Sequence, residues 1–183
     1  PTVGAELAEK GILAVICSLA AIMVYIWFRF EWQFSIAAIL ALAHDVLTTI
    51  GLFALTSFEF NLATVAAILT IAGYSINDTV VVFDRVRENL RRYKSYEQPA
   101  ILNMSLNETL SRTVMTSVTT MLALLAIVLF GGAVLRDFAL AMMWGVLIGT
   151  YSSIFVAVGM LAFFDLKKNL DEDEDPGVMR EEG

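Results

Sequence analysis

Two charged residues in this chain sit where charge is costly. Asp78 lies in the run of residues 73–85, with an apolar sequence back to Leu62 before it and residues 80–83 after it. An ionised group inside a bilayer costs at least about 2.5–3.5 kcal/mol, so such a group is usually paired, hydrated or used on an ion. Arg112 opens a later apolar run. Because a guanidinium stays charged, separating it from a carboxylate favours proton uptake by the acid, which is the chemistry of a proton-coupled switch.

The residues around Asp78 predict a polar helix face. Thr70, Tyr74, Asn77 and Asp78 recur at helical spacing, and Thr79 follows directly. Polar groups in a membrane helix usually face a bundle interior rather than lipid. We therefore expect this face to point into the bundle, with Asn77 and Thr79 supporting the acid.

The run that follows places Arg112 at a matching depth. Ser105 and Glu108 have capping-box spacing, which predicts a helix that begins near Ser105. Arg112 is then about two turns into that helix, level with Asp78 on the preceding antiparallel helix, and Thr116 follows one turn later. Asp78 and Arg112 are the candidate proton-coupling pair. A static ion pair and an arginine that snorkels to the surface remain as alternatives.

His44 and Asp45 form a second polar site inside another apolar run. A histidine beside an aspartate could relay protons or set a pH response, but the sequence favours a satisfied interhelical hydrogen bond. The sequence has one histidine and one cysteine, so a His/Cys metal site is not expected. Nucleotide-binding and hydrolase motifs are lacking, so we expect no enzyme activity and no cofactor, with a proton gradient as the energy source.

Composition and hydropathy indicate a membrane protein. The 183 residues are 58% hydrophobic and 17% charged, against about 45–50% and 25% in soluble domains. Long apolar runs without period-2 alternation predict membrane-spanning helices rather than strands. The expected fold is an all-α, polytopic bundle of five transmembrane helices, at residues 11–28, 34–57, 62–83, 112–130 and 138–164.

The distribution of charge predicts the topology. Basic residues gather at one end of the spans, which the positive-inside rule places in the cytoplasm. Residues 1–10 are then an extracytoplasmic lead-in, and residues 11–165 form the bundle, with a cytoplasmic loop at about 84–110. Residues 166–183 form an acidic, disordered cytoplasmic tail that carries much of the net charge of −7, and nothing favours nucleic-acid binding. A GxxxG pattern at Gly145 and Gly149 predicts close helix packing.

The segment 73–89, with the sequence GYSINDTVVVFDRVREN, resembles the signature of the SecF family of protein-export membrane proteins. Shorter matches occur at residues 3–7, 43–45 and 111–117, and the likeness extends to about Lys168. The resemblance implies an RND-like transmembrane domain in the bacterial inner membrane. The family has six spans and a large external domain, so we expect this chain to be a piece that lacks the first span and that domain.

The resemblance also implies partners and a role. It implies pairing with SecD, contact with the SecY–SecE–SecG channel, YajC and YidC as further neighbours, and an unfolded preprotein held by the missing external domain. The family uses the proton motive force late in translocation, and Asp78 and Arg112 match its intramembrane acidic and basic residues. Two alternatives stay open: a purely structural anchoring module of the translocase, and an RND-type small-molecule exporter.

Overall fold

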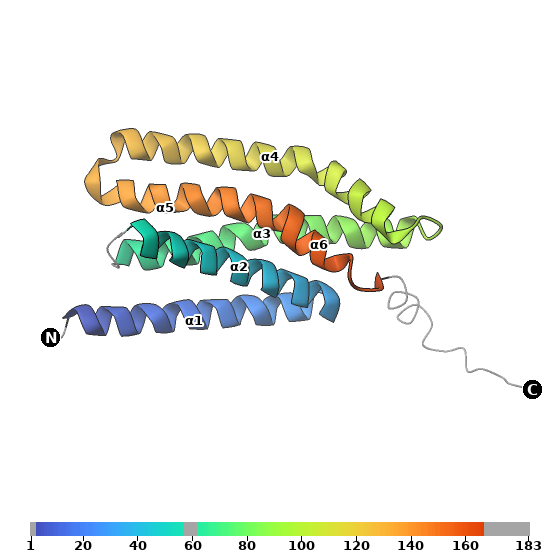
Figure 1. Ribbon diagram of the computed structural model, residues 1–183, viewed down its shortest axis with the longest axis horizontal. Coiled ribbons are helices and arrows are strands. Elements are labelled where there is room, and N and C mark those ends of the chain that lie inside the picture. Colours follow the sequence, from blue (N-terminus) through green and yellow to red (C-terminus); the bar gives the residue numbers. More distant parts are fainter. Residues whose placement is uncertain (1–2, 57–61, 167–183) are drawn as a thin grey trace, which may run out of the picture.

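The computed structural model describes residues 3–56 and 62–166, and these form helices without a strand (Figure 1). The helices are α1 Val3–Arg29, α2 Trp32–Thr56, α3 Leu62–Arg92, α4 Gln98–Phe130, α5 Gly132–Tyr151, the π-helical η1 Ser152–Ala157 and α6 Val158–Leu161. Within this described part, five helical segments are long and apolar enough to cross a membrane; the fifth runs through α5, η1 and α6. The predicted five-helix, all-α membrane fold is confirmed.

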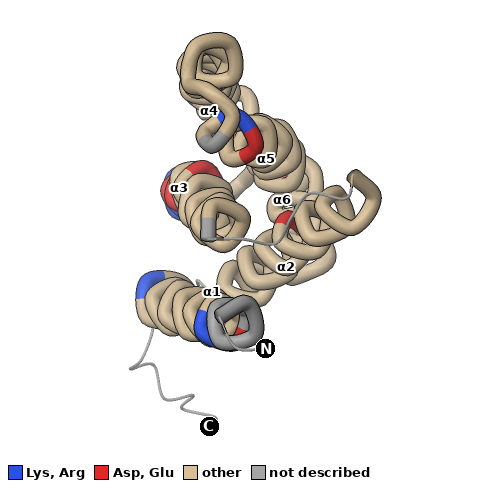
Figure 2. Tube along the Cα trace, turned by 90° about the vertical axis from the view of Figure 1, so that its left-hand side faces the viewer, with Lys and Arg blue, Asp and Glu red and all other residues tan. Residues whose placement is uncertain are grey.

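The helices differ in how much the bundle covers them. Half of the most apolar window of α3 is buried, against 11% for α1 and for α4. Helix α3 contacts α1, α2, α4 and α5, and α1 and α4 lie at opposite edges of the bundle (Figure 2). The outer helices present large apolar side chains to the surroundings, as lipid-facing helices do. The central helix α3 is therefore the element best placed to hold polar groups away from lipid.

Small residues let α5 approach α3 closely. A Cβ at Gly145 would lie 2.2 Å from Cγ1 of Ile71, and one at Gly149 would lie 3.1 Å from Cβ of Ser75. Such distances leave no room for a side chain at Gly145. The close helix contact predicted from the GxxxG pattern is confirmed.

The connection between α3 and α4 is shorter than the sequence predicts. Both helices extend beyond the apolar spans, and only residues 93–97 between them are not helical. Helix α4 begins at Gln98 with Pro99 in its first turn, where proline's fixed φ and missing N–H fit. The prediction of a start near Ser105 was wrong, because Ser105 donates to the carbonyl of Ile101 inside the helix and Glu108 binds Arg85. The expected loop at about 84–110 consists mainly of two helix ends.

Some predictions fall on residues that the structure does not describe. These are the first two residues, the connection between the spans predicted at 34–57 and 62–83, and residues 167–183 of the predicted tail. The turn between α1 and α2, by contrast, is described and is as short as expected, with α1 ending at Arg29 and α2 beginning at Trp32.

Candidate functional site

Asp45 is the centre of a buried hydrogen-bonded cluster that joins three elements. Its side chain on α2 is fully buried. Its Oδ2 accepts a hydrogen bond from Ser75 Oγ on α3 and another from Ser152 Oγ on η1, the latter at 2.6 Å. Its Oδ1 lies 3.0 Å from Nδ1 of His44, which donates when the carboxylate is ionised because an ionised carboxylate only accepts. Every oxygen of this carboxyl group therefore has a partner within the chain.

The π-helical turn η1 brings two adjacent serines to this cluster. Ser152 bonds to Asp45, while Ser153 Oγ lies 3.0 Å from Thr79 Oγ1 on α3. Ser153 also donates to the carbonyl of Gly149 at 2.8 Å. A π-turn has more residues per turn than an α-helix, so adjacent residues are separated by somewhat less than the 100° of an α-helix and here face two neighbouring helices. The turn thus ties the fifth span to both α2 and α3.

Asp78 is buried without such partners. Its side chain is 4% exposed, yet no group in the described chain donates a hydrogen bond to its buried Oδ2. Thr79, the next residue, is also buried, but its hydroxyl is committed to Ser153 and to the carbonyl of Ser75. A buried polar atom without a partner costs free energy, and in native proteins it often marks a working site.

Side-chain pairs fix the register of the antiparallel helices α3 and α4. These pairs are Tyr74 with Thr120 at 3.4 Å, Arg85 with Glu108 at 2.6 Å and Asn89 with Ser105 at 3.0 Å. In this register Asp78 lies opposite Thr116, and Arg112 lies opposite Val81. Arg112 is therefore one helical turn from Asp78, toward the end of the bundle where the arginines gather.

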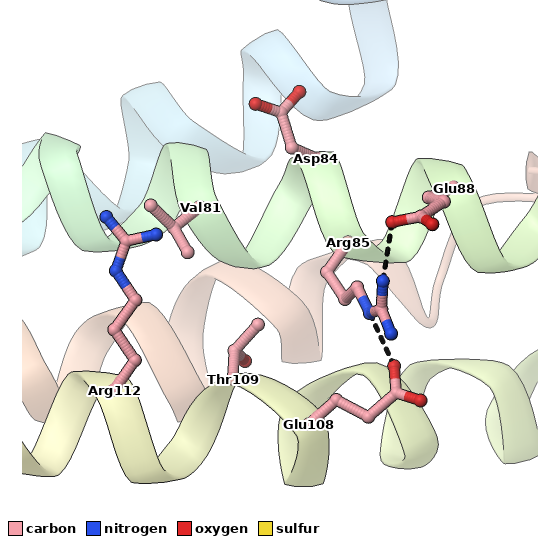
Figure 3. Close-up of a pocket in the computed structure, with 7 residues that line it drawn as sticks. All are labelled: Val81, Asp84, Arg85, Glu88, Glu108, Thr109 and Arg112. Carbon is pink, nitrogen blue, oxygen red and sulfur yellow. Dashed lines mark hydrogen bonds and ion pairs between the residues drawn. The ribbon is translucent and has the colours of Figure 1, made fainter.

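A polar groove separates the two helices at this level (Figure 3). It has a volume of about 360 Å³ and is lined by Val81, Asp84, Arg85, Glu88, Glu108, Thr109 and Arg112. Arg85 bridges its far end, with 2.6 Å bonds to Glu88 on α3 and to Glu108 on α4. Arg112 reaches toward α3 beside Val81. Its charge acts on Asp78, but the two form no ion pair within the described chain.

The other predicted site residues are distributed unevenly. Thr116 is half-buried, and its hydroxyl donates to the backbone carbonyl of Arg112 at 3.1 Å. Thr70 and Asn77 are exposed, so the prediction that their face points into the bundle was wrong. The neighbours of α3 cover its other sides. A stripe of small and polar residues stays open along it: Ala66, Thr70, Gly73 and Asn77.

Sequence reasoning missed the serines that bind Asp45. Ser75, Ser152 and Ser153 are not predicted from the sequence as partners of a buried acid. The usable signal was the spacing of Ser75 and Thr79, one turn apart on α3, together with a serine pair inside an apolar span. Across the residues that the structure describes, no three His, Cys, Asp or Glu side chains come together to hold a metal ion.

Comparison with known proteins identifies relatives over most of the chain. The family model described as "Protein export membrane protein SecD/SecF, C-terminal" matches residues 1–167. The SecF protein translocase subunit of Rhodobacter capsulatus is 54% identical over 96% of this chain and 53% of its own length. The SecF subunit of Rickettsia bellii is 52% identical over 92% of this chain and 55% of its own length. The chain thus spans about half the length of the curated relatives it matches.

Solved structures agree with the sequence relatives. The crystal structure of the translocon-associated membrane protein SecDF from Thermus thermophilus matches with a TM-score of 0.84 at 49% identity, over 88% of this chain and 22% of that one. SecDF in its super-membrane-facing form matches with a TM-score of 0.83 at 46% identity, over 95% of this chain and 24% of that one. The chain therefore belongs to the family of SecD/SecF protein-export membrane proteins, of which it contains the C-terminal region.

Proposed function

We propose that this chain is the membrane region of a SecF-type subunit of the bacterial Sec translocase. With SecD, it uses the proton motive force to promote late stages of preprotein translocation through the SecY channel. It carries no catalytic chemistry and needs no cofactor. Energy enters as protons that bind and leave Asp78 while Arg112 approaches and withdraws.

The observation that carries this proposal is the buried, incompletely bonded carboxylate of Asp78. A structural aspartate would be expected to have its oxygens bonded, as those of Asp45 are. Arg112 lies one turn away, near enough for its charge to act on Asp78 but not paired with it. A small relative movement of α3 and α4 therefore changes how strongly the carboxylate is held in its charged form.

The open stripe on α3 supports a partner beside this site. Ala66, Thr70, Gly73 and Asn77 leave α3 uncovered next to Asp78. Small and polar residues are typical of helix–helix interfaces in membranes. The similar SecDF chains are more than four times as long as the matched region, so they contain much that is missing here. We propose that SecD occupies this stripe.

The remaining contacts and the location follow from the same role. We propose an inner-membrane protein with the arginine-rich end and the C-terminus in the cytoplasm, in line with the positive-inside rule. The SecY–SecE–SecG channel, YajC and YidC are proposed neighbours in the membrane. The unfolded preprotein is proposed to bind outside this chain.

The Asp45 cluster favours a second candidate function, a purely structural anchoring module. Its serines connect three elements across the bundle, as a packing device does. In that case Asp78→Asn lowers the yield of the complex with SecD, and adding Arg112→Gln restores the yield without restoring transport.

The test uses the full-length protein in complex with SecD. We expect Asp78→Asn to abolish gradient-dependent preprotein export in membrane vesicles while co-purification with SecD stays normal. Asp137→Asn is the matched control, because it makes the same change at an exposed aspartate on α5 that lines neither groove beside α3. Normal export by the Asp78→Asn complex would contradict the proposal, and loss of SecD association would favour the structural module.

A further inference from the structure

A second groove lies on the other side of α3, between this helix and the end of α1. It has a volume of about 440 Å³. The residues that line it are Arg29, Asp84, Arg87, Glu88, Arg91 and Arg92. The members from α3 follow helical spacing, so they share one face. Four of the six are arginines, whose planar, forked guanidinium groups match phosphate oxygens.

The carboxylates near this groove already have partners. Asp84 accepts two hydrogen bonds from Arg29, at 2.8 and 3.1 Å, and Glu88 bonds to Arg85, one turn earlier on α3. Arg87 pairs with Glu31 at 2.9 Å.

Two arginines remain for a ligand. Arg91 and Arg92 are exposed, and neither makes an ion pair within the described residues. Arg92 lies over the ring of Tyr93, with 5.5 Å between guanidinium carbon and ring centre. This stacking orients one guanidinium without using its donors.

The groove lies at the depth of phospholipid headgroups. Asp84 marks the point where α3 changes from apolar to charged, and Arg91 lies about 10 Å further along the helix axis. The headgroup layer is about 5–8 Å thick on each side of the hydrocarbon core. The groove therefore begins at the edge of the hydrocarbon, where Arg29 meets Asp84, and runs through the headgroup layer to just outside it, from where the long side chains of Arg91 and Arg92 can reach back to lipid phosphates.

An apolar wall continues from the groove toward the membrane interior. One turn before Arg29, on the same side of α1, Tyr25 is 55% exposed, and Phe28 beside it is 87% exposed. Acyl chains can lie against these side chains while a phosphate lies among the arginines. A free phosphate or an acidic peptide would make no use of this wall.

We propose that the groove, with the end of α1, binds the headgroup of an anionic phospholipid. The phosphate contacts Arg91 and Arg92 at the mouth, and the acyl chains follow the exposed side of α1. The site is independent of proton coupling at Asp78, so either proposal can fail without the other. It differs from a general attraction of basic residues to the membrane because it depends on particular guanidinium groups.

The test uses the chain in mixed micelles, with Trp27 as a reporter. Trp32 and Trp144 are first replaced by phenylalanine, which leaves Trp27 as the single tryptophan, two residues before Arg29 at the end of α1. Phosphatidylglycerol with brominated acyl chains is titrated in, and brominated phosphatidylcholine serves as the reference lipid. We expect phosphatidylglycerol to quench Trp27 at a concentration at least about fivefold lower than phosphatidylcholine.

Variants decide whether the arginines cause that preference. Arg91→Gln with Arg92→Gln should raise the phosphatidylglycerol concentration needed by about tenfold and leave phosphatidylcholine unchanged. Arg91→Lys with Arg92→Lys keeps the charge and should recover only part of the preference. The matched control, Lys10→Gln with Arg136→Gln, removes two charges from the opposite end and should change nothing.

Specific outcomes would overturn the proposal. They are equal quenching by the two lipids, an unchanged preference in the double glutamine variant, full recovery in the lysine variant, or an equal loss in the control. Inorganic phosphate and an acidic peptide are also added as competitors. If either one removes the preference for phosphatidylglycerol at a concentration equal to that of the lipid phosphate, the apolar wall contributes nothing to binding. That result would also overturn the proposal. Size-exclusion chromatography and circular dichroism confirm that each variant is folded.

Discussion

Two buried aspartates on neighbouring helices differ in almost every bond they make. Asp45 is fully buried, and its oxygens face Ser75, Ser152 and His44. Asp78 is buried nearly as deeply, yet its Oδ2 has no donor in the described chain. Burial alone therefore does not distinguish a structural carboxylate from a working one. The hydrogen-bond partners do, because a satisfied carboxylate stabilises one arrangement while an unsatisfied one favours a change.

The largest expected effect comes from removing the satisfied acid. Asp45→Ala leaves the buried hydroxyls of Ser75 and Ser152 without their acceptor and should lower the free energy of unfolding by about 3 kcal/mol. Unfolding in mixed detergent micelles, followed by circular dichroism, measures this change. Asp84→Ala, which removes a half-exposed aspartate, should cost less than about 1 kcal/mol. If Asp45→Ala lowers the free energy of unfolding no more than Asp84→Ala does, the structural role of Asp45 is contradicted.

The close approach of α5 to α3 should be the next most sensitive feature. Gly145→Val forces a side chain into space that Ile71 occupies and should cost about 2 kcal/mol in the same assay. The control is Gly73→Val, since nothing lies within 4 Å of a Cβ there and its side chain meets no neighbour. Equal stability of the two variants would show that the helices are free to separate at Gly145.

Replacing Asp78, whose Oδ2 has no hydrogen-bond donor in the described chain, should increase stability rather than lower it. Asp78→Asn keeps the shape but removes a buried charge, so the free energy of unfolding should rise by about 1 kcal/mol. The same unfolding assay measures it, with Asp45→Asn as the comparison, which should be destabilising. A loss of stability at Asp78 would mean that its carboxylate has a partner in the folded bundle, which would break the contrast.

The smallest effect is expected at the arginine-rich end. Glu88 is 55% exposed where it meets Arg85, so Glu88→Gln should cost less than about 0.5 kcal/mol. Raising the salt concentration should reduce this difference further, because exposed ion pairs are screened. A salt-independent cost above 1 kcal/mol would show that the bridge from Arg85 to both helices contributes to the bundle's stability.

The sequence predicts most of the fold and part of the site. Apolar runs place five spans correctly because length and hydropathy are local properties of the chain. Arg112 was expected level with Asp78, but the register of α3 and α4 places it one turn away, a detail set by side-chain pairs between the two helices. The start of α4 was misplaced because a favourable capping pattern at Ser105 competed with Pro99, which fits the first turn of a helix better.

The partners of Asp45 could not be predicted from local sequence. Ser75 and Ser152 lie 30 and 107 residues away from it, and only the packed bundle brings them together. The same limit explains the misplaced polar face of α3. Helical spacing shows which residues share a side, but only the neighbours decide whether that side is covered, and among the described residues none covers Thr70 or Asn77.

The most direct test of the central claim is proton flux through vesicles that contain the full-length protein with SecD. The claim is that Asp78 exchanges protons while Asp45 holds the bundle together. An imposed proton gradient should drive flux in the unmodified complex and in the Asp137→Asn control, and Asp78→Asn should abolish the flux while the complex stays assembled. Undiminished flux through an assembled Asp78→Asn complex would contradict the account.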